Sequence, residues 1–242
     1  ADSGQLNMTL GLITFDLDHT LWDPTDALIA AERAMFDWIS KHSPVTAEFY
    51  PPEKFHAYKK DLAAAYPELT GKVSEFRFQL LRRIFLQSGH DSDSARRMAQ
   101  DAFAAFYQAR STDLILFESV AEVMTELKAS YPLIALTNGN ADLDIAGHTH
   151  LFDRHLKADD YEAKPSPDMF EAALQHAGVE SQQALHIGDH PEQDVAAAQA
   201  VGMKTLWFNN KQADWPLADC QPDGKFSHWS QLVQAIKALE GS

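Results

Sequence analysis

The stretch ITFDLDHT, residues 13–20, runs from a short apolar segment directly into two carboxylates, Asp16 and Asp18. The apolar side chains predict a buried strand that begins at Gly11 and ends at Phe15. Two carboxylates one residue apart repel each other, and burying either of them without a partner is costly. The pair therefore lies either in a solvated loop or beside a cation that holds it.

Strand and helix signals alternate along the chain after residue 112. Short apolar runs bounded by turn residues predict buried strands at 132–136, 184–187 and 203–208. Helices are expected at about 119–129, 166–177, 191–202 and 230–239. The first opens with the capping-box spacing of Ser119 and Glu122, and the second with Ser166 as N-cap before Pro167. This alternation predicts an α/β fold, with a parallel sheet covered by helices on both faces.

Between the first strand and this alternating region lies a segment with a different pattern. From Pro24 to about Arg110, apolar residues recur at helical spacing, and prolines and a glycine separate the periodic stretches. We expect about four helices here and no strand. The predicted organisation is therefore a core domain formed by residues 9–22 and 112–242, with an inserted all-helical domain at 23–111.

Three of the predicted strands end in chemically capable side chains. The first is followed by Asp16 and Asp18, the second by Thr137-Asn138, and the third by Gly188-Asp189. Parallel strands bring their carboxyl ends to one edge of the sheet, where open α/β folds bind ligands. We therefore expect these residues, which are far apart in the sequence, to form one site.

Composition limits the classes of partner. The chain has 242 residues, is 45% hydrophobic and carries a formal net charge of −15, which disfavours nucleic acid and anionic membrane surfaces. There is no apolar run of about 18 residues that would predict a membrane span. The single cysteine, Cys220, excludes a disulfide within one chain and is compatible with the cytoplasm. The polar N-terminal residues ADSGQLNM predict a frayed start without a signal peptide.

Four motifs, in order, resemble those of the haloacid dehalogenase-like (HAD) phosphohydrolases. The matching residues are Asp16-Leu17-Asp18-His19-Thr20 for DxDx[TV], Thr137 after the second strand, Lys164 before a helix, and Gly188-Asp189 with Asp194 for GDxxxxD. The resemblance covers about residues 11 to 239. It implies a Rossmann-like core, and the helical insert resembles the cap of the type I subgroup.

The resemblance also implies a role for each carboxylate. Asp16 would be the nucleophile that forms an aspartyl-phosphate, and Asp18 would protonate the leaving alkoxide and then deprotonate water. Mg²⁺ would bind the Asp16 carboxylate, the Asp18 backbone carbonyl and Asp189, since hard divalent ions prefer oxygen ligands. Asp194 would act through a water or from behind these ligands. An alternative for Asp194 is the favourable position of an acidic residue in the first turn of a helix.

Two further positions would bind the phosphoryl group. Thr137 and neighbouring backbone N–H groups would hold its oxygens, with Asn138 as a second candidate that is also a common turn former. Lys164 would neutralise the charge of the nucleophile and the phosphoryl group in the transition state.

Other polar residues remain open to interpretation. His19 and His190 adjoin motif aspartates, where they could adjust the site or simply face solvent. His186 and His190 lie four residues apart, a spacing that could suggest a pair of metal ligands. They lie across a strand-to-loop junction, however, so they need not share a face. In the insert, arginines that could contact a substrate, or form an ordinary solvated helix face, are Arg77, Arg82 and Arg83.

Alternative reactions differ in what they require of Asp18. The dehalogenases that resemble these phosphohydrolases lack an acid at this position, because they have no alkoxide to protonate. The presence of Asp18 therefore favours phosphoryl transfer. A phosphomutase uses the same groups, and a non-catalytic ligand-binding protein on this fold is a further alternative. The stretches FDLDHTLWD, PLIALTNGNAD and LHIGDHPEQDVAAAQAVGM are similar to bacterial FMN hydrolases that also dephosphorylate a ribitylaminouracil phosphate.

That similarity suggests FMN or a riboflavin-pathway ribityl phosphate as the substrate, with pyridoxal phosphate or sugar phosphates as alternatives. The expected partner is thus a small phosphorylated metabolite. We expect a monomer or a small homo-oligomer.

Overall fold

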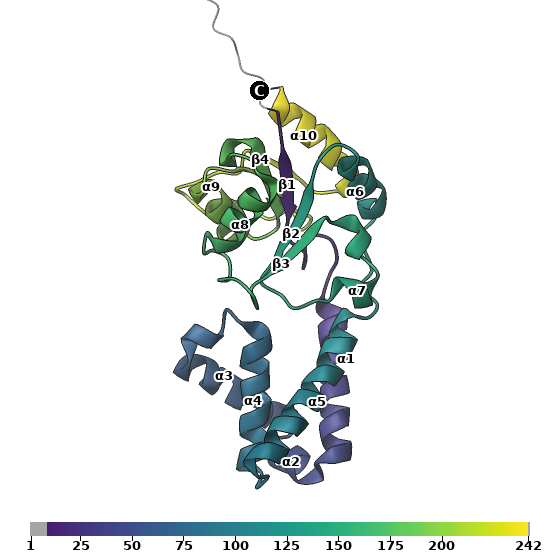
Figure 1. Cartoon of the computed structure of the whole chain (residues 1–242), viewed down its shortest axis with the longest axis vertical. Helices are drawn as coiled ribbons and strands as arrows, with labels where there is room; N and C mark the ends of the chain where they lie inside the picture. The colour runs from purple at the N-terminus through teal and green to yellow at the C-terminus, as the bar shows by residue number, and fades with distance from the viewer. Residues whose placement is uncertain (1–8, 242) are drawn as a thin grey trace, which may run out of the picture. The chain divides into compact units, whose positions relative to one another are not determined.

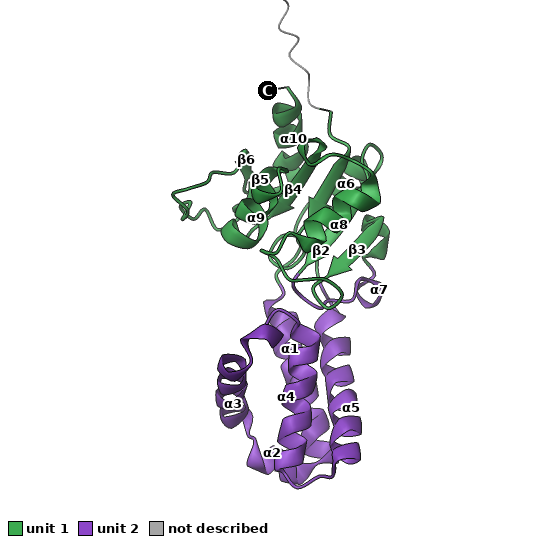
Figure 2. Ribbon diagram, turned by 60° about the vertical axis from the view of Figure 1, so that its left-hand side comes forward, with its two compact units in different colours: residues 1–23, 115–137, 148–242 green, residues 24–114, 138–147 purple. Residues whose placement is uncertain are grey.

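The computed structural model describes residues 9–241, which divide into two compact units (Figure 2). One unit contains residues 9–23, 115–137 and 148–241, and the other contains 24–114 and 138–147. The segment 138–147 follows a strand and has no helical periodicity, so nothing in the sequence grouped it with the helices. The prediction for ADSGQLNM concerns residues 1–8, which lie outside the described residues.

The first unit is built on a six-stranded parallel sheet with the order β3-β2-β1-β4-β5-β6. The strands are β1 (Leu12–Phe15), β2 (Leu133–Thr137), β3 (Arg154–Lys157), β4 (Ala184–Gly188), β5 (Lys204–Phe208) and β6 (Gly224–Phe226). The predicted parallel α/β fold is confirmed. Because β1 lies between β2 and β4, the segment after β1 is flanked by the ends of both neighbouring strands.

Helices cover both faces of this sheet (Figure 1). They are α6 (Val120–Lys128), α8 (Asp168–Ala177), α9 (Ala197–Ala200) and α10 (Leu232–Glu240). Leu12 and Leu136 pack with Phe170 of α8 in one apolar cluster. On the opposite face of β1, Phe15 stacks on Trp229 with ring centroids 5.9 Å apart. The central strand is therefore buried on both faces, as its apolar sequence requires.

Two strands and two helix starts differ from the sequence predictions. The edge strands β3 and β6 were missed because they are short and carry exposed polar residues, so they lack the apolar run that marks a buried strand. Helix α6 forms, but Ser119 has φ 68° and its side chain makes no capping bond. Helix α8 begins at Asp168, with Pro167 at the N-cap position in place of Ser166.

Short turns of helix connect these elements. They are the 3₁₀ segments Thr149–Leu151, Ser181–Gln183 and Trp229–Gln231, and the π-helix Pro191–Ala196 that leads into α9. Gly178 ends α8 in the left-handed conformation with φ 67°, as the sequence predicts.

The second unit consists of helices packed around their own core. They are α1 (Thr25–His42), α2 (Pro44–Phe49), α3 (Pro52–Ala65), α4 (Val73–Gln87), α5 (Ser92–Ser111) and α7 (Leu143–Ala146), with a 3₁₀ turn at Pro67–Leu69. The buried core includes Met35, Leu80, Phe85 and Phe106. Prolines begin α2 and α3, where a missing N–H costs nothing. Within residues 9–241, no helix is long and apolar enough to cross a membrane.

Truncating the central strand should destabilise the sheet unit. We expect Leu12→Ala to lower the free energy of unfolding by about 2–5 kcal/mol, because Leu12 is fully buried and the truncation leaves a cavity. Urea unfolding followed by tryptophan fluorescence measures this loss. Ile115→Ala is the control, since Ile115 is 80% exposed and should change stability by less than about 0.5 kcal/mol. Equal losses in the two variants would contradict this view of the core.

Candidate active site

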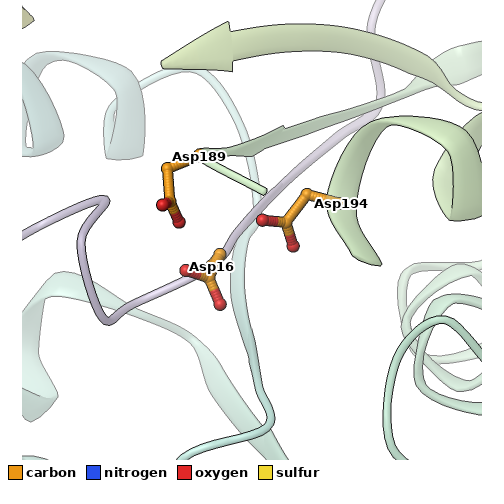
Figure 3. Close-up of side chains that lie close together, drawn as sticks. All are labelled: Asp16, Asp189 and Asp194. Atoms are coloured by element: carbon orange, nitrogen blue, oxygen red, sulfur yellow. The ribbon is translucent and has the colours of Figure 1, made fainter. Parts of the chain in front are cut away.

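Three carboxylates gather at the carboxyl edge of the sheet (Figure 3). Asp16 follows β1, Asp189 follows β4, and Asp194 lies in the π-helix after β4. One oxygen from each lies within 4.8 Å of the others. The expectation that residues from separate strand ends meet here is therefore met for these three.

Lys164 joins two of these carboxylates. Its Nζ lies 2.8 Å from Asp16 Oδ1 and 2.6 Å from Asp194 Oδ1, and its side chain is buried. Burial alone would lower the pKa of the Lys164 ammonium, but the two carboxylates outweigh burial and raise it above its ordinary value. The lysine is therefore charged and held between its two partners.

Asp16 is held through both its backbone and its side chain. Its backbone N–H donates to the Ile187 carbonyl at 2.9 Å, and Thr20 Oγ1 donates to Oδ2 of Asp16 at 3.2 Å. Burial raises the pKa of Asp16 well above its ordinary value, and the charges of Asp194 and Asp189 raise it further against the opposing effect of Lys164. In this arrangement the negative charge of Asp16 is only partly compensated.

Asp194, by contrast, is fully engaged. Oδ1 accepts from Lys164 and lies 3.1 Å from His186 Nε2, while Oδ2 accepts from the His190 backbone N–H at 2.9 Å. Burial would raise the pKa of Asp194, but Lys164 and His186 overcome it and hold the pKa well below the ordinary range. Gly188 makes this approach possible, because a Cβ at that position would lie 2.3 Å from Asp194 Cγ.

Asp189 is the least buried of the three carboxylates. Burial and the charge of Asp194 raise the pKa of Asp189 to about 6, although His19, Lys164 and His190 oppose the shift. Its backbone carbonyl accepts from Trp207 Nε1 at 2.8 Å, which fixes the chain just after β4.

Asp18 is oriented by a tryptophan. The indole Nε1 of Trp22 donates to Asp18 Oδ1 at 2.8 Å, and Trp22 itself is fully buried with its ring stacked against His148. The chain between them turns tightly, with His19 at φ 63° and its Nδ1 3.9 Å from an oxygen of Asp23. Because Trp22 is fixed by packing, one oxygen of Asp18 has a defined position.

The remaining predicted residues are placed as follows. Thr137 is buried at the end of β2, beside β1. Asn138 begins the segment 138–147 that groups with the helical unit, and its role stays a prediction. His190 acts as a helix cap, since its Nδ1 accepts from the N–H groups of Glu192 and Gln193 at 3.2 Å.

The insert arginines have separate surroundings within the helical unit. Arg77 lies over the ring of Phe106 with its Cζ 3.6 Å from the centroid, and burial lowers the pKa of Arg77 to about 10. Arg83 lies over Tyr66, and Arg82 donates to Ser92 Oγ.

Sequence reasoning missed two residues that hold the site together. Trp22 stands in the first motif region, and its place four residues after Asp18 was a signal that could have been used. His186 lies in a buried strand, where a single histidine carries no pattern that distinguishes it.

The donor set fits a hard divalent cation. Burial raises the pKa values of both Asp16 and Asp189, and the charges of neighbouring carboxylates raise them further. A divalent cation would relieve that repulsion. Asp194 already accepts from a lysine, a histidine and a backbone N–H. Asp16 and Asp189 are therefore the carboxylates better suited to bind a metal ion directly.

The raised pKa of Asp189 predicts a pH-dependent stability in the metal-free protein. Its folded pKa of about 6 exceeds the ordinary 3.8, so the folded state binds the proton more tightly. This stabilising contribution is full below about pH 4 and is lost as pH rises through about 6. Urea unfolding in EDTA should therefore show the wild type losing stability relative to Asp189→Asn over this interval.

The exposed Asp219→Asn variant is the control for that measurement. Its stability difference from the wild type should not vary with pH. A difference between the wild type and Asp189→Asn that is constant from pH 4 to 7 would contradict the assignment.

Comparisons with known proteins show which family and which proteins this chain resembles. A family model described as haloacid dehalogenase-like hydrolase matches residues 10–202. A crystal structure named 2-haloacid dehalogenase, from Pseudomonas syringae pv. tomato, has a TM-score of 0.89 at 34% identity and covers 95% of this chain and 99% of its own. A 5-amino-6-(5-phospho-D-ribitylamino)uracil phosphatase of Escherichia coli is 28% identical over 85% of this chain and 86% of that protein.

A glyceraldehyde 3-phosphate phosphatase of Pyrococcus abyssi is 29% identical over 81% of this chain and 80% of that protein. The family model alone spans well over half of the 242 residues. This match shows that the chain belongs to the haloacid dehalogenase-like hydrolases.

Proposed function

We propose that this hydrolase is a Mg²⁺-dependent phosphomonoester phosphatase that works through an aspartyl-phosphate on Asp16. The observation that carries the proposal is the buried contact of Lys164 Nζ with Asp16, 2.8 Å away, beside two more carboxylates. Such a site combines a nucleophile, a fixed cation and oxygen ligands for a metal, which are the groups that phosphoryl transfer requires.

Asp16 is the proposed nucleophile. A carboxylate oxygen of Asp16 forms a bond to phosphorus as the bond from phosphorus to the ester oxygen breaks. Lys164 stabilises the negative charge that gathers around phosphorus, and the pair remains in position because Asp194 holds the lysine from the other side. Thr137, at the end of the neighbouring strand, is proposed to bind a phosphoryl oxygen, with Asn138 beside it.

Mg²⁺ would be held by Asp16, by the backbone carbonyl of Asp18 and by Asp189. When bound, it supplies positive charge that draws an anionic phosphate to an acidic protein and offsets repulsion between the carboxylates. The raised pKa values of Asp16 and Asp189 support this assignment, because burial and the neighbouring carboxylates disfavour the charged form of both groups, which a bound cation would stabilise.

Asp18 is the proposed acid and base. It gives its proton to the departing alkoxide oxygen, and it then takes a proton from the water that attacks phosphorus and releases Asp16. The hydrogen bond from Trp22 supports this role, since a group that serves two opposite steps must keep one position.

A dehalogenase is the second candidate, favoured by the name of the 34%-identical Pseudomonas syringae structure, 2-haloacid dehalogenase. In that reaction a carboxylate would displace halide from carbon, and halide departs without needing a proton. The well-oriented Asp18 has no use in such a reaction. Phosphoryl transfer therefore accounts for more of the site than dehalogenation does. A phosphomutase, the other alternative, uses the same groups and differs from a phosphatase in protecting the phosphorylated intermediate from water.

The proposed substrate is FMN or a ribityl phosphate of riboflavin synthesis. The name of the Escherichia coli relative supports a ribityl phosphate. The Pyrococcus abyssi relative, a glyceraldehyde 3-phosphate phosphatase, supports sugar phosphates as an alternative, and pyridoxal phosphate is a further one. We assign the choice of substrate to the helical unit acting as a cap. A cytoplasmic location is part of this proposal, supported by the single cysteine.

The test is phosphate release from a panel of phosphomonoesters that contains FMN, pyridoxal phosphate and sugar phosphates, with Mg²⁺ or with EDTA. We expect Mg²⁺-dependent release by the wild type and a loss of at least about 10³-fold for Asp16→Asn, because the amide is not a nucleophile. Asp219→Asn, an exposed substitution of the same kind, should retain full activity.

Three outcomes would overturn parts of the proposal. Release that persists in Asp16→Asn would exclude Asp16 as the nucleophile. Chloride release from 2-chloropropionate without phosphate release from any ester would favour the dehalogenase. A panel ranking that places sugar phosphates far above FMN would reject the flavin substrate and leave the reaction unchanged.

A further inference from the structure

Two buried polar side chains lie side by side in the centre of the sheet. Thr14 of β1 and His186 of β4 are partners in the parallel register, and both are almost completely buried. The His186 ring meets the ring of Phe170 in α8 edge-on, with centroids 5.0 Å apart. Both side chains therefore belong to the apolar layer between the sheet and α8.

The fold itself does not need polarity at these positions. The same layer is formed by apolar residues, among them Leu12, Leu136 and Met169. Burying an imidazole and a hydroxyl in such a layer costs free energy unless each finds a partner, and an apolar pair of similar volume would pack without that cost. The reason for the histidine is therefore to be sought in what it contacts.

Its contacts fix the state of the imidazole. His186 Nε2 lies 3.1 Å from Asp194 Oδ1, and Nδ1 lies 2.8 Å from Thr14 Oγ1. Burial favours the neutral ring by lowering the pKa of His186, although the hydrogen bond to Asp194 opposes this shift. A neutral imidazole has one donor and one acceptor nitrogen. Since the Asp194 carboxylate can only accept, Nε2 is then the donor. Nδ1 accepts from the Thr14 hydroxyl, which lies nearer to Nδ1 than to its other acceptor, the Leu185 carbonyl at 3.4 Å.

The result is a continuous chain of directed hydrogen bonds. Thr14 donates to His186, His186 donates to Asp194, and Lys164 donates to both Asp194 and Asp16. Asp194 Oδ1 accepts from both the lysine and the histidine, so the direction of the carboxylate depends on both. The strand interior is thereby connected to the nucleophile.

We propose that His186 is a positioning residue, which holds the Asp194 carboxylate through Nε2–H so that Lys164 stays directed at Asp16. Asp194 selects the tautomer, and the Thr14 hydroxyl supports it by donating to Nδ1. The kinetic consequence rests on the proposed phosphatase function, whereas the tautomer and the hydrogen-bond chain do not. Within the described chain, His186 is outside the group of side chains that could hold a metal ion.

Three substitutions separate positioning from packing. In His186→Gln the amide nitrogen can occupy the place of Nε2, so the donor to Asp194 is kept. In His186→Asn the amide nitrogen reaches only the place of Nδ1, so the donor is lost while polarity stays. His186→Leu removes polarity and suits the apolar layer, so it controls for packing and stability.

We expect the kcat for phosphate release to fall about 10- to 100-fold in the Leu and Asn variants, with a smaller change in KM, because a hydrogen bond to a charged group is lost. The Gln variant should remain within about threefold of the wild type. Thermal unfolding is measured alongside, and the Leu variant should be at least as stable as the Gln variant.

A purely structural role gives a different pattern. It predicts that the Leu variant keeps wild-type kcat, or that kcat follows thermal stability across the three variants. Either pattern overturns the proposal, and so does a Gln variant that is as inactive as the Asn variant.

The tautomer is tested without any turnover. A long-range ¹H–¹⁵N correlation spectrum of metal-free, ¹⁵N-histidine-labelled protein should show His186, assigned by its absence from His186→Gln, as a neutral ring protonated at Nε2. Thr14→Val should leave the ring protonated at Nε2, because Asp194 still accepts from it, but should move the ¹⁵N shift of Nδ1, which loses its hydrogen-bond donor. A ring protonated at Nδ1, or at both nitrogens, overturns the inference.

These readouts keep two failures apart. If the wild type releases no phosphate from any ester, the proposed function fails, and the spectrum alone decides whether His186 holds Asp194. If the wild type is active and the variants do not follow the expected order, the positioning role fails and the phosphatase stands.

Discussion

The rest of the site depends on one interaction, the contact of the buried Lys164 ammonium with the carboxylates of Asp16 and Asp194. Three charges that are removed from water are tolerable only together, since removing one partner leaves an uncompensated buried charge on the others. Burial, together with the repulsion between the carboxylates, raises the pKa values of Asp16 and Asp189. The features that make the metal-free site costly also make it a good host for a divalent cation.

The parallel sheet is what brings these charges together. β1 ends one residue before Asp16 and β4 ends one residue before Asp189, and because the strands are neighbours the two carboxylates reach one edge. The loop before α8 supplies Lys164, and the π-helix after β4 returns Asp194 against Gly188. Asp16 is thus held by one group that lies 148 residues away in the sequence, Lys164, and by another that lies only four residues away, Thr20.

The sequence predicted the parallel fold and the residues at the strand ends, because buried strands are apolar and the carboxylates that follow them stand out. It did not reveal the edge strands β3 and β6. These strands are stabilised by pairing with a neighbouring strand and do not need an apolar run, so no such run marks them in the sequence. Ser119 matched a capping pattern, yet its backbone took the left-handed conformation, since the tertiary fold overrides local spacing. His186 could not be assigned from spacing, because its partners are set by packing, whereas Trp22 lies four residues after its partner Asp18 and carried a usable signal.

The central claim, that Asp16 is the nucleophile which this charge cluster prepares, is tested most directly by trapping the intermediate. The wild-type enzyme would be mixed with Mg²⁺ and its best ester, quenched in acid during turnover, and digested for mass spectrometry. We expect a phosphoryl group on the peptide that contains Asp16, and its fragments should locate it on that residue. A phosphoryl group on a different residue, or none while phosphate is being released, would contradict the claim.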